Sequence, residues 1–212
     1  MEKAWAINWS IPEEPVMRDS VSFLKERGQF REVSQRAFAL GIQVSTGGNL
    51  SIQVADGLFL VKPSGISLFD LKEREVLLID RTGVVLEGKG KPSKEWNSHS
   101  GIYGVRKDVG SIVHYHPPFA TAHAVAGIEV PLLTVHAKRL LKRVPLISSA
   151  KEGSEDLAIM TRKAFSDGGV KTILLSEHGI IAVGKDLLEA QNMAELLEES
   201  AKIALLSRLT RP

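Results

Sequence analysis

Three histidines are the first candidates for chemistry, because two of them share one strand face. His114 and His116 lie in VHYHPP, and His178 lies in LLSEHG. Alternate residues of a strand point to the same face with Cα atoms roughly 6.5–7 Å apart, so both imidazoles can converge on one cation. A bare H-x-H pair is a weak signal, and two surface histidines on an edge strand are the alternative. A third histidine at the end of a second apolar strand favours an open catalytic metal site.

Three loops rich in small residues form a second candidate feature. They are Gly47-Gly48-Asn49, Ser64-Gly65, and Pro92-Ser93-Lys94-Glu95. Such loops expose backbone N–H groups, and together they can form a concave site for a phosphate group. None matches the P-loop or the dinucleotide-binding glycine motif, and each alone is also typical of an ordinary turn.

Glu95 and a basic run at 138–143 each allow two interpretations. Glu95 precedes a predicted helix, where a carboxylate complements the helix dipole, but it can equally act as a general acid/base. The basic run, KRLLKR, is typical of a solvated helix face, and it can also attract an anionic substrate. Spacing alone does not decide either case.

The elements that must position these residues alternate between helix and strand. Apolar periodicity, proline and glycine predict helices over 16–40 (with a break at Gly28), over 95–106 and after Pro118, and a final helix capped by Asp186. They also predict strands over 50–54, 58–62, 75–80, 83–86 and 111–116, and two more within 171–183. The pattern predicts an α/β fold with a central sheet covered by helices. The sheet is expected to be mixed or antiparallel, because several connections are too short for crossovers. One domain over 1–212, with a loose N-terminal arm at 1–15, is the simplest organisation.

Composition excludes several classes of protein. The chain has 212 residues, 43% of them hydrophobic and 25% charged, which excludes a disordered chain. A net charge of +2 is too balanced for binding nucleic acid or membranes by bulk charge. The absence of cysteine excludes disulfides and thiolate metal ligands. With neither a signal-peptide pattern nor an apolar run of about 18 residues, we expect a soluble, cytoplasmic protein.

Five motifs together resemble one protein family. GGNLS, KPSG, PSKEW, VHYHPPFATA and LLSEHG occur in the order and approximate spacing of the class II aldolase/adducin family, over roughly residues 25–205. The length and the HxH-PP context are most similar to the branch that holds L-fuculose-1-phosphate aldolase and related short-chain sugar-phosphate aldolases. The resemblance implies a three-layer sandwich with helices on both sides of the sheet. It also implies a homotetramer with active sites at subunit interfaces, for which Trp5 and Trp9 are candidate anchors.

The resemblance also implies roles for individual residues. His114, His116 and His178 match the ligands of one divalent metal per subunit, with zinc as the first choice and manganese or cobalt as alternatives. Glu95 matches the catalytic acid/base, which can also contact the metal when no substrate is bound. The phosphate-binding positions of the family match Gly48, Asn49, Ser64, Gly65, Ser93 and Lys94.

Two departures from the family pattern affect the expected reaction. The aldolases usually have Ser-Ser-Glu where this chain has Ser93-Lys94-Glu95, and the lysine resembles family members that decarboxylate sugar-acid phosphates. The aldolases also place a proton-donating tyrosine in the segment that matches 131–137, which here reads PLLTVHA. His136 can replace that tyrosine as a proton donor, or it can be a polar residue of a helix face.

The resulting hypothesis is a metal-dependent aldolase that acts on a small phosphorylated sugar. It would cleave a ketose 1-phosphate reversibly to dihydroxyacetone phosphate and an aldehyde. The alternatives at the same site are decarboxylation of a sugar-acid phosphate, dehydration and 4-epimerisation. A structural head domain like that of adducin is disfavoured, because a scaffold does not need three histidines and Glu95.

Overall fold

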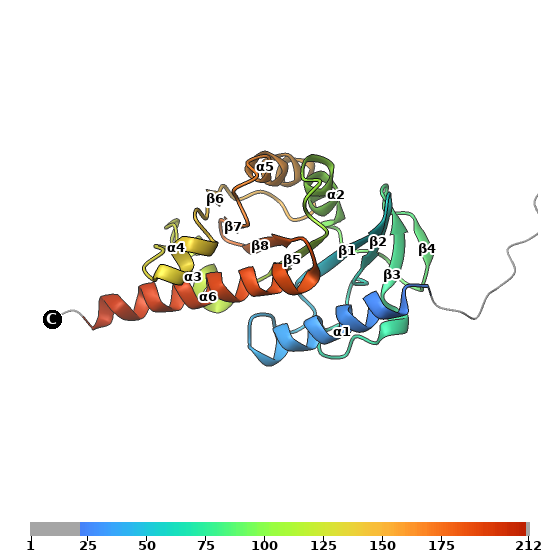
Figure 1. The fold of residues 1–212 in the computed structure, drawn as a ribbon, viewed down its shortest axis with the longest axis horizontal. Coiled ribbons are helices and arrows are strands. Elements are labelled where there is room, and N and C mark those ends of the chain that lie inside the picture. Colours follow the sequence, from blue (N-terminus) through green and yellow to red (C-terminus); the bar gives the residue numbers. More distant parts are fainter. Residues whose placement is uncertain (1–21, 211–212) are drawn as a thin grey trace, which may run out of the picture.

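The computed structural model describes residues 22–210, and its centre is a mixed eight-stranded sheet (Figure 1). In chain order the strands are β1 (Asn49–Ala55), β2 (Leu58–Val61), β3 (Leu77–Asp80), β4 (Val85–Glu87), β5 (Ser111–Tyr115), β6 (Leu146–Ile147), β7 (Thr172–Leu175) and β8 (Gly179–Gly184). Their order across the sheet is β4-β3-β2-β1-β5-β8-β7-β6. Only the β6–β7 pair is parallel within this sheet, so the predicted mixed sheet is confirmed.

Helices cover both faces of the sheet. They are α1 (Leu24–Ala39), α2 (Trp96–Val105), α3 (Pro118–Val125), α4 (Val135–Leu140), α5 (Glu155–Phe165) and α6 (Leu187–Leu209), with a short 3₁₀ turn at Glu73–Glu75. Helices α2 and α5 pack together over one face, whereas α1, α3 and α6 cover the other (Figure 1). This arrangement confirms the predicted three-layer α/β sandwich. Within residues 22–210, no helix combines the length and the apolar character needed to cross a bilayer.

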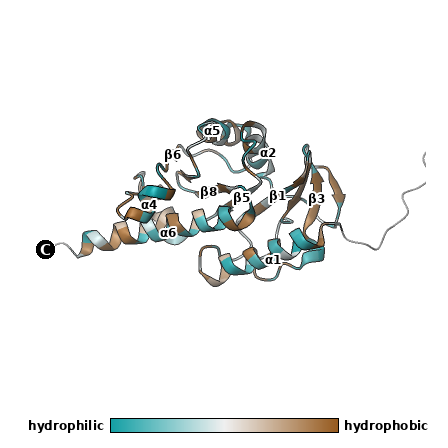
Figure 2. Ribbon diagram, viewed as in Figure 1, coloured by the Kyte–Doolittle hydropathy of each residue, from teal (hydrophilic) through white to brown (hydrophobic). Residues whose placement is uncertain are grey.

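Strand alternation on β5 divides its side chains between the two hydrophobic cores. Ile112 joins the core under α2 and α5, whereas Val113 and Tyr115 join the core under α6, where the Tyr115 hydroxyl donates to Gln191 at 2.8 Å. Figure 2 shows the hydrophobic colour along the strands and hydrophilic residues over much of α1. Because residues two apart share a face, the alternation turns His114 toward the α2 side of the sheet.

The first helix differs from its prediction. Helix α1 begins at Leu24 and continues through Gly28 without a break. A helix-interior glycine costs only about 1 kcal/mol, and the burial of Phe30 and Val33 on the same helix offsets that cost. Residues 16–21 and the predicted N-terminal arm, including Trp5 and Trp9, lie outside the described residues.

Three elements were absent from the predicted helices and strands, although the basic run at 138–143, which overlaps α4, was typical of a helix face. Helix α4 and strand β6 have six and two residues, too few for a visible period. Helix α5 did carry a signal, because Ser154 caps it by accepting a hydrogen bond from Leu157 N and two acidic residues follow in its first turn. The predicted cap of the last helix is confirmed, since Asp186 accepts a hydrogen bond from Glu189 N at 2.8 Å.

Candidate metal centre and active site

The three predicted metal-ligand histidines converge at one edge of the sheet. Strand β5 pairs with β8, with Tyr115 opposite Ile180, so the chain after β5 lies beside the turn that carries His178. The ring centroids of His114 lie 4.8 Å from His116 and 4.7 Å from His178, and those of His116 and His178 are 5.3 Å apart. One ring nitrogen of each histidine lies within 4.8 Å of the others. The geometry therefore suits a shared cation.

The imidazole of His114 is oriented by the backbone of β8. Its Nδ1 lies 2.8 Å from the carbonyl oxygen of Ile180, and because a carbonyl only accepts, Nδ1 carries the proton. The opposite nitrogen, Nε2, is buried and makes no well-aligned hydrogen bond among the described residues, although the Glu95 carboxylate lies 3.0 Å away. A metal ion could bind at this nitrogen beside the carboxylate. This orientation fits a metal ligand held by a backbone hydrogen bond.

Glu95 lies beside the histidines rather than capping its helix. It occupies the N-cap of α2, yet its side chain accepts no hydrogen bond from the helix backbone. Its carboxylate, only 4% exposed, lies 3.0 Å from His114 Nε2 and 3.4 Å from His178 Nε2, and it accepts a hydrogen bond from Asn49 Nδ2 at 2.8 Å. If Glu95 served only to cap the helix, its carboxylate would accept a hydrogen bond from the helix backbone, and it does not.

Opposing effects set the charges in this cluster. Burial acts to raise the pKa of Glu95, but the charge and hydrogen bonding of His114 lower it overall, with smaller contributions from His178 and Asn49, so the carboxylate is ionised. Burial lowers the pKa of His116 to about 3, and the neighbouring histidines add to that shift. Burial likewise lowers the pKa of His178, with help from His114. Both shifts favour the neutral imidazole, the form that binds a metal. For His114 the effect of burial is outweighed by the Glu95 carboxylate and the Ile180 carbonyl, which raise its pKa.

The three predicted phosphate-binding loops are connected by hydrogen bonds, and two of them contact Glu95. Ser64 N donates to the carbonyl oxygen of Lys91 at 2.8 Å, which joins the second loop to the third. The Ser93 hydroxyl accepts from Glu95 N at 3.3 Å, and Asn49 is buried with its amide on Glu95. The structure thus brings Asn49 and Ser93 to the acid/base candidate.

Gln43 supports the first of these loops and was not predicted from the sequence. Its buried side chain accepts a hydrogen bond from His116 N at 3.0 Å and donates to Val44 O at 2.8 Å. Gly48 adopts a φ of 67°, and a Cβ there would lie 2.6 Å from Gln43 Oε1. The glycine is needed for both reasons. A glutamine in the loop after a helix carries no sequence signal for such a role.

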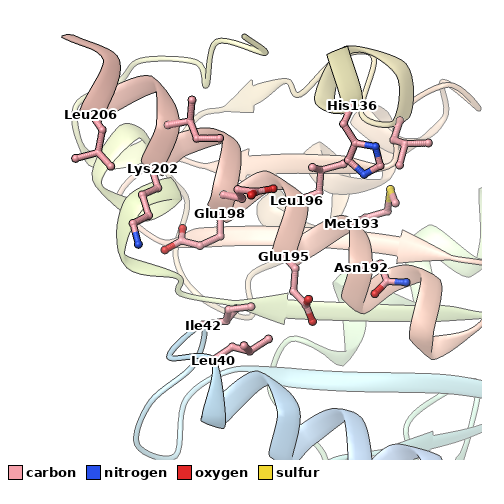
Figure 3. Close-up of a pocket in the computed structure, with 13 residues that line it drawn as sticks. Leu40, Ile42, His136, Asn192, Met193, Glu195, Leu196, Glu198, Lys202 and Leu206 are labelled. Atoms are coloured by element: carbon pink, nitrogen blue, oxygen red, sulfur yellow. The ribbon is translucent and has the colours of Figure 1, made fainter. Parts of the chain in front are cut away.

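His136 lies apart from the three metal-ligand histidines in its own chain. It is on α4, with Nδ1 3.3 Å from Arg139 Nη2, and it lines a separate cavity of about 870 Å³ between α4, α6 and the loop after α1. Figure 3 shows its imidazole directed toward Met193 and Leu196 on α6. Within one chain, the structure does not join this predicted proton donor to the metal centre.

Comparison with known proteins agrees with this arrangement. Residues 29–205 match the model of the class II aldolase and adducin N-terminal domain family. The chain is 35% identical to an L-fuculose phosphate aldolase of Methanocaldococcus jannaschii over 88% of this chain and 99% of the relative. It is also 35% identical to a 5-methylthioribulose-1-phosphate/5-deoxyribulose-1-phosphate aldolase of Rhodospirillum rubrum, over 81% and 76% of the two chains.

A solved structure is similar throughout the fold. An L-fuculose 1-phosphate aldolase superimposes with a TM-score of 0.80 at 31% identity, over 91% of this chain and 90% of that chain. The matched region includes β1, the α2 N-terminus, β5 and the β7–β8 turn, which carry the site. The chain belongs to the class II aldolase and adducin N-terminal domain family.

Proposed function

We propose that this protein is a metal-dependent aldolase that cleaves a ketose 1-phosphate reversibly to dihydroxyacetone phosphate and an aldehyde. The observation that carries the proposal is the contact of the Glu95 carboxylate with His114 at 3.0 Å and His178 at 3.4 Å. An ionised carboxylate beside three converging imidazoles places an acid/base next to a metal-binding group. The named activities of the relatives support the same reaction class.

One divalent metal per subunit would be held by His114, His116 and His178. Three imidazoles suit zinc first, with manganese and cobalt as alternatives. When bound, the metal supplies Lewis-acid stabilisation of the negative charge that develops on the substrate oxygens. The backbone hydrogen bond to His114 Nδ1 keeps Nε2 free for this purpose.

Glu95 would carry the proton at the carbon that becomes nucleophilic. In the cleavage direction the ionised Glu95 carboxylate would accept the C4 hydroxyl proton as the C3–C4 bond breaks and the aldehyde forms, and it would then return this proton to C3. In the synthesis direction the same carboxylate removes that proton. His114 does most to lower the pKa of Glu95, and the hydrogen bond from Asn49 orients the carboxylate and adds to this shift.

The phosphate group of the substrate would bind the loops around Glu95. The residues proposed for this role are Gly48, Asn49, Ser64, Gly65, Ser93 and Lys94. Lys94 adds a positive charge suited to an anion. Asn49 already donates one hydrogen to Glu95, and its amide nitrogen has a second hydrogen for another acceptor.

A homotetramer with sites at the subunit interfaces would explain the position of His136. Because His136 lies in a separate cavity of its own chain, it could donate a proton only at the site of a neighbouring subunit. Light scattering and a mixed-tetramer experiment that combines His136→Ala subunits with Glu95→Gln subunits test this arrangement. Restored activity in the mixture supports shared sites, and its absence contradicts them.

A second candidate reaction rests on Lys94, because the lysine resembles family members that decarboxylate sugar-acid phosphates. A product assay on ketose 1-phosphates and sugar-acid phosphates distinguishes the two reactions. We expect aldehyde and dihydroxyacetone phosphate as products, lost on chelation and restored by zinc or manganese. Release of carbon dioxide alone, or full activity in a metal-free preparation, would contradict the aldolase proposal.

A further inference from the structure

A cavity of about 380 Å³ opens directly beside the candidate metal centre. His116 and His178 form one side of it, and Glu152 and Glu177 form much of the other, together with Ser149 and Ser176. None of the residues proposed to bind phosphate lines this cavity. A substrate whose phosphate occupied the loops would therefore extend its other end into this space.

A tight turn brings the backbone of Glu152 to this cavity, where its side chain is exposed. Ser154 N donates to the carbonyl oxygen of Lys151 at 3.0 Å, and Gly153 adopts a φ of 70° inside the turn. A Cβ on Gly153 would lie 2.9 Å from the carbonyl oxygen of Lys94, so the glycine lets the turn pack against the residue before Glu95. A carboxylate oxygen of Glu152 consequently lies within 4.8 Å of ligand atoms of both Glu95 and His178.

The charges around the cavity limit what it can accept. Two carboxylates line it, and its described lining includes no lysine or arginine. A dianionic phosphate would be repelled there, and an apolar tail would cover Glu152 without offering it a hydrogen bond. A hydroxyl group, in contrast, can donate to the Glu152 carboxylate while it faces the two serines.

We propose that this cavity binds the part of the substrate that becomes the aldehyde, and that Glu152 selects substrates with a hydroxyl group there. The inference rests on the proposed aldolase function and adds the substrate class, a sugar phosphate hydroxylated at its far end. This substrate class would differ from that of the Rhodospirillum rubrum relative, whose name specifies deoxy and methylthio sugars.

A matched pair of substrates tests the selection by one hydroxyl group. D-Ribulose 1-phosphate and 5-deoxy-D-ribulose 1-phosphate differ only at the terminal carbon. We expect kcat/KM of the wild-type protein to favour the hydroxylated sugar by about tenfold or more, as a hydrogen bond to a charged group implies. Glu152→Leu should abolish or invert that preference, and Glu152→Gln should keep part of it. Glu129→Leu, at an exposed residue outside the cavity, is the matched control and should leave the ratio unchanged.

Titration of each metal-free variant with cobalt(II), followed by absorption, separates selection from metal binding. We expect Glu152→Leu to bind cobalt with wild-type affinity. A tenfold or greater loss of affinity would overturn the inference, because Glu152 would then be a metal ligand. If every variant cleaves both sugars and the ratio of their kcat/KM values does not change, the inference is overturned but the proposed function is not. Cleavage of neither sugar by the wild-type protein would overturn the proposed function and, with it, the inference.

Discussion

Two buried clusters of charged side chains in this protein differ in how completely they are hydrogen-bonded. Arg27, on α1, is fully buried, and its guanidinium donates to the backbone carbonyls of Ser22, Glu73 and Val76 and to the carboxylate of Glu87 at 2.7 Å. These bonds tie α1 to the loop before β3 and to the edge strand β4. Every nitrogen of the guanidinium has a partner inside the protein.

The second cluster, Glu95 with His114 and His178, leaves a polar atom without such a partner. His114 is 1% exposed in its side chain, and its Nε2 has no hydrogen bond among the described residues, although Glu95 Oε2 lies 3.0 Å away. The comparison indicates that Arg27 serves the fold, whereas the histidine cluster is organised for something the chain itself does not provide. A cation satisfies both the free nitrogen and the adjacent carboxylate.

Replacing Glu95 should give the largest effect. Glu95→Gln keeps the size and the hydrogen-bonding capacity of the side chain but removes its basicity. We expect kcat to fall by about 10²–10⁴-fold, or roughly 3–5.5 kcal/mol in barrier height, with KM little changed. Steady-state kinetics measure kcat and KM, and thermal unfolding measures the melting temperature. Near wild-type kcat with a lower melting temperature would show that Glu95 is only structural.

Arg27→Met should produce the opposite pattern. Removing one partner of a buried ion pair typically costs about 3–5 kcal/mol, and we expect the lower value, about 3 kcal/mol, because Glu87 is partly exposed. The kcat of the folded protein should not change. Arg31→Met, which breaks the exposed pair with Glu73, is the control and should cost at most about 1 kcal/mol. A large loss of kcat in Arg27→Met would remove the distinction between the two clusters.

Metal binding should stabilise the wild-type protein but not a variant that lacks a ligand. At a free zinc concentration of one hundred times Kd, binding to the folded state alone adds about 2.7 kcal/mol. We expect zinc to raise Tm of the wild type and of Arg27→Met equally, and to leave Tm of His114→Ala unchanged. Calorimetry of chelated and reloaded samples provides the measurement. A zinc-dependent shift that survives in His114→Ala would contradict the ligand assignment.

The smallest expected effect concerns pH and distinguishes His99 from the metal-ligand histidines. Burial lowers the pKa of His99 to about 3. Below pH 6.5 the unfolded chain therefore binds a proton that the folded chain does not, and stability falls as pH decreases from about 6.5 toward 3. In the metal-free protein, His99→Gln should reduce the slope of the unfolding free energy against pH by up to about 1.4 kcal/mol per pH unit.

Metal should leave this contribution of His99 in place, because His99 hydrogen-bonds to Ser51 instead of joining the converging histidines. Unfolding free energies at pH 5, 6 and 7, with and without zinc, check the prediction. An unchanged slope in His99→Gln would show that this buried histidine is protonated in the folded state.

The sequence by itself determined the candidate metal-ligand set and the layer plan. His114 and His116 are separated by two along a strand, so their common face follows from backbone geometry alone. The motifs in register identified His178 and Glu95. The structure places the Glu95 carboxylate 3.4 Å from His178 Nε2 and 3.0 Å from His114 Nε2. Apolar periodicity likewise predicted the long helices, because they are set by local burial patterns, and short connections predicted a mixed or antiparallel sheet.

Only the tertiary structure decided which polar residues support that site. Gln43 and Glu152 reach it from segments with no local pattern, through contacts that depend on Gly48 and Gly153 having no side chain. The position of His136 was also decided by the tertiary structure. Its segment aligns with that of the family's tyrosine, but in the folded chain it lines a cavity apart from the candidate metal ligands. Sequence spacing fixes which side chains share a strand or helix face, but contacts between distant segments depend on how the packed layers bring the loops together.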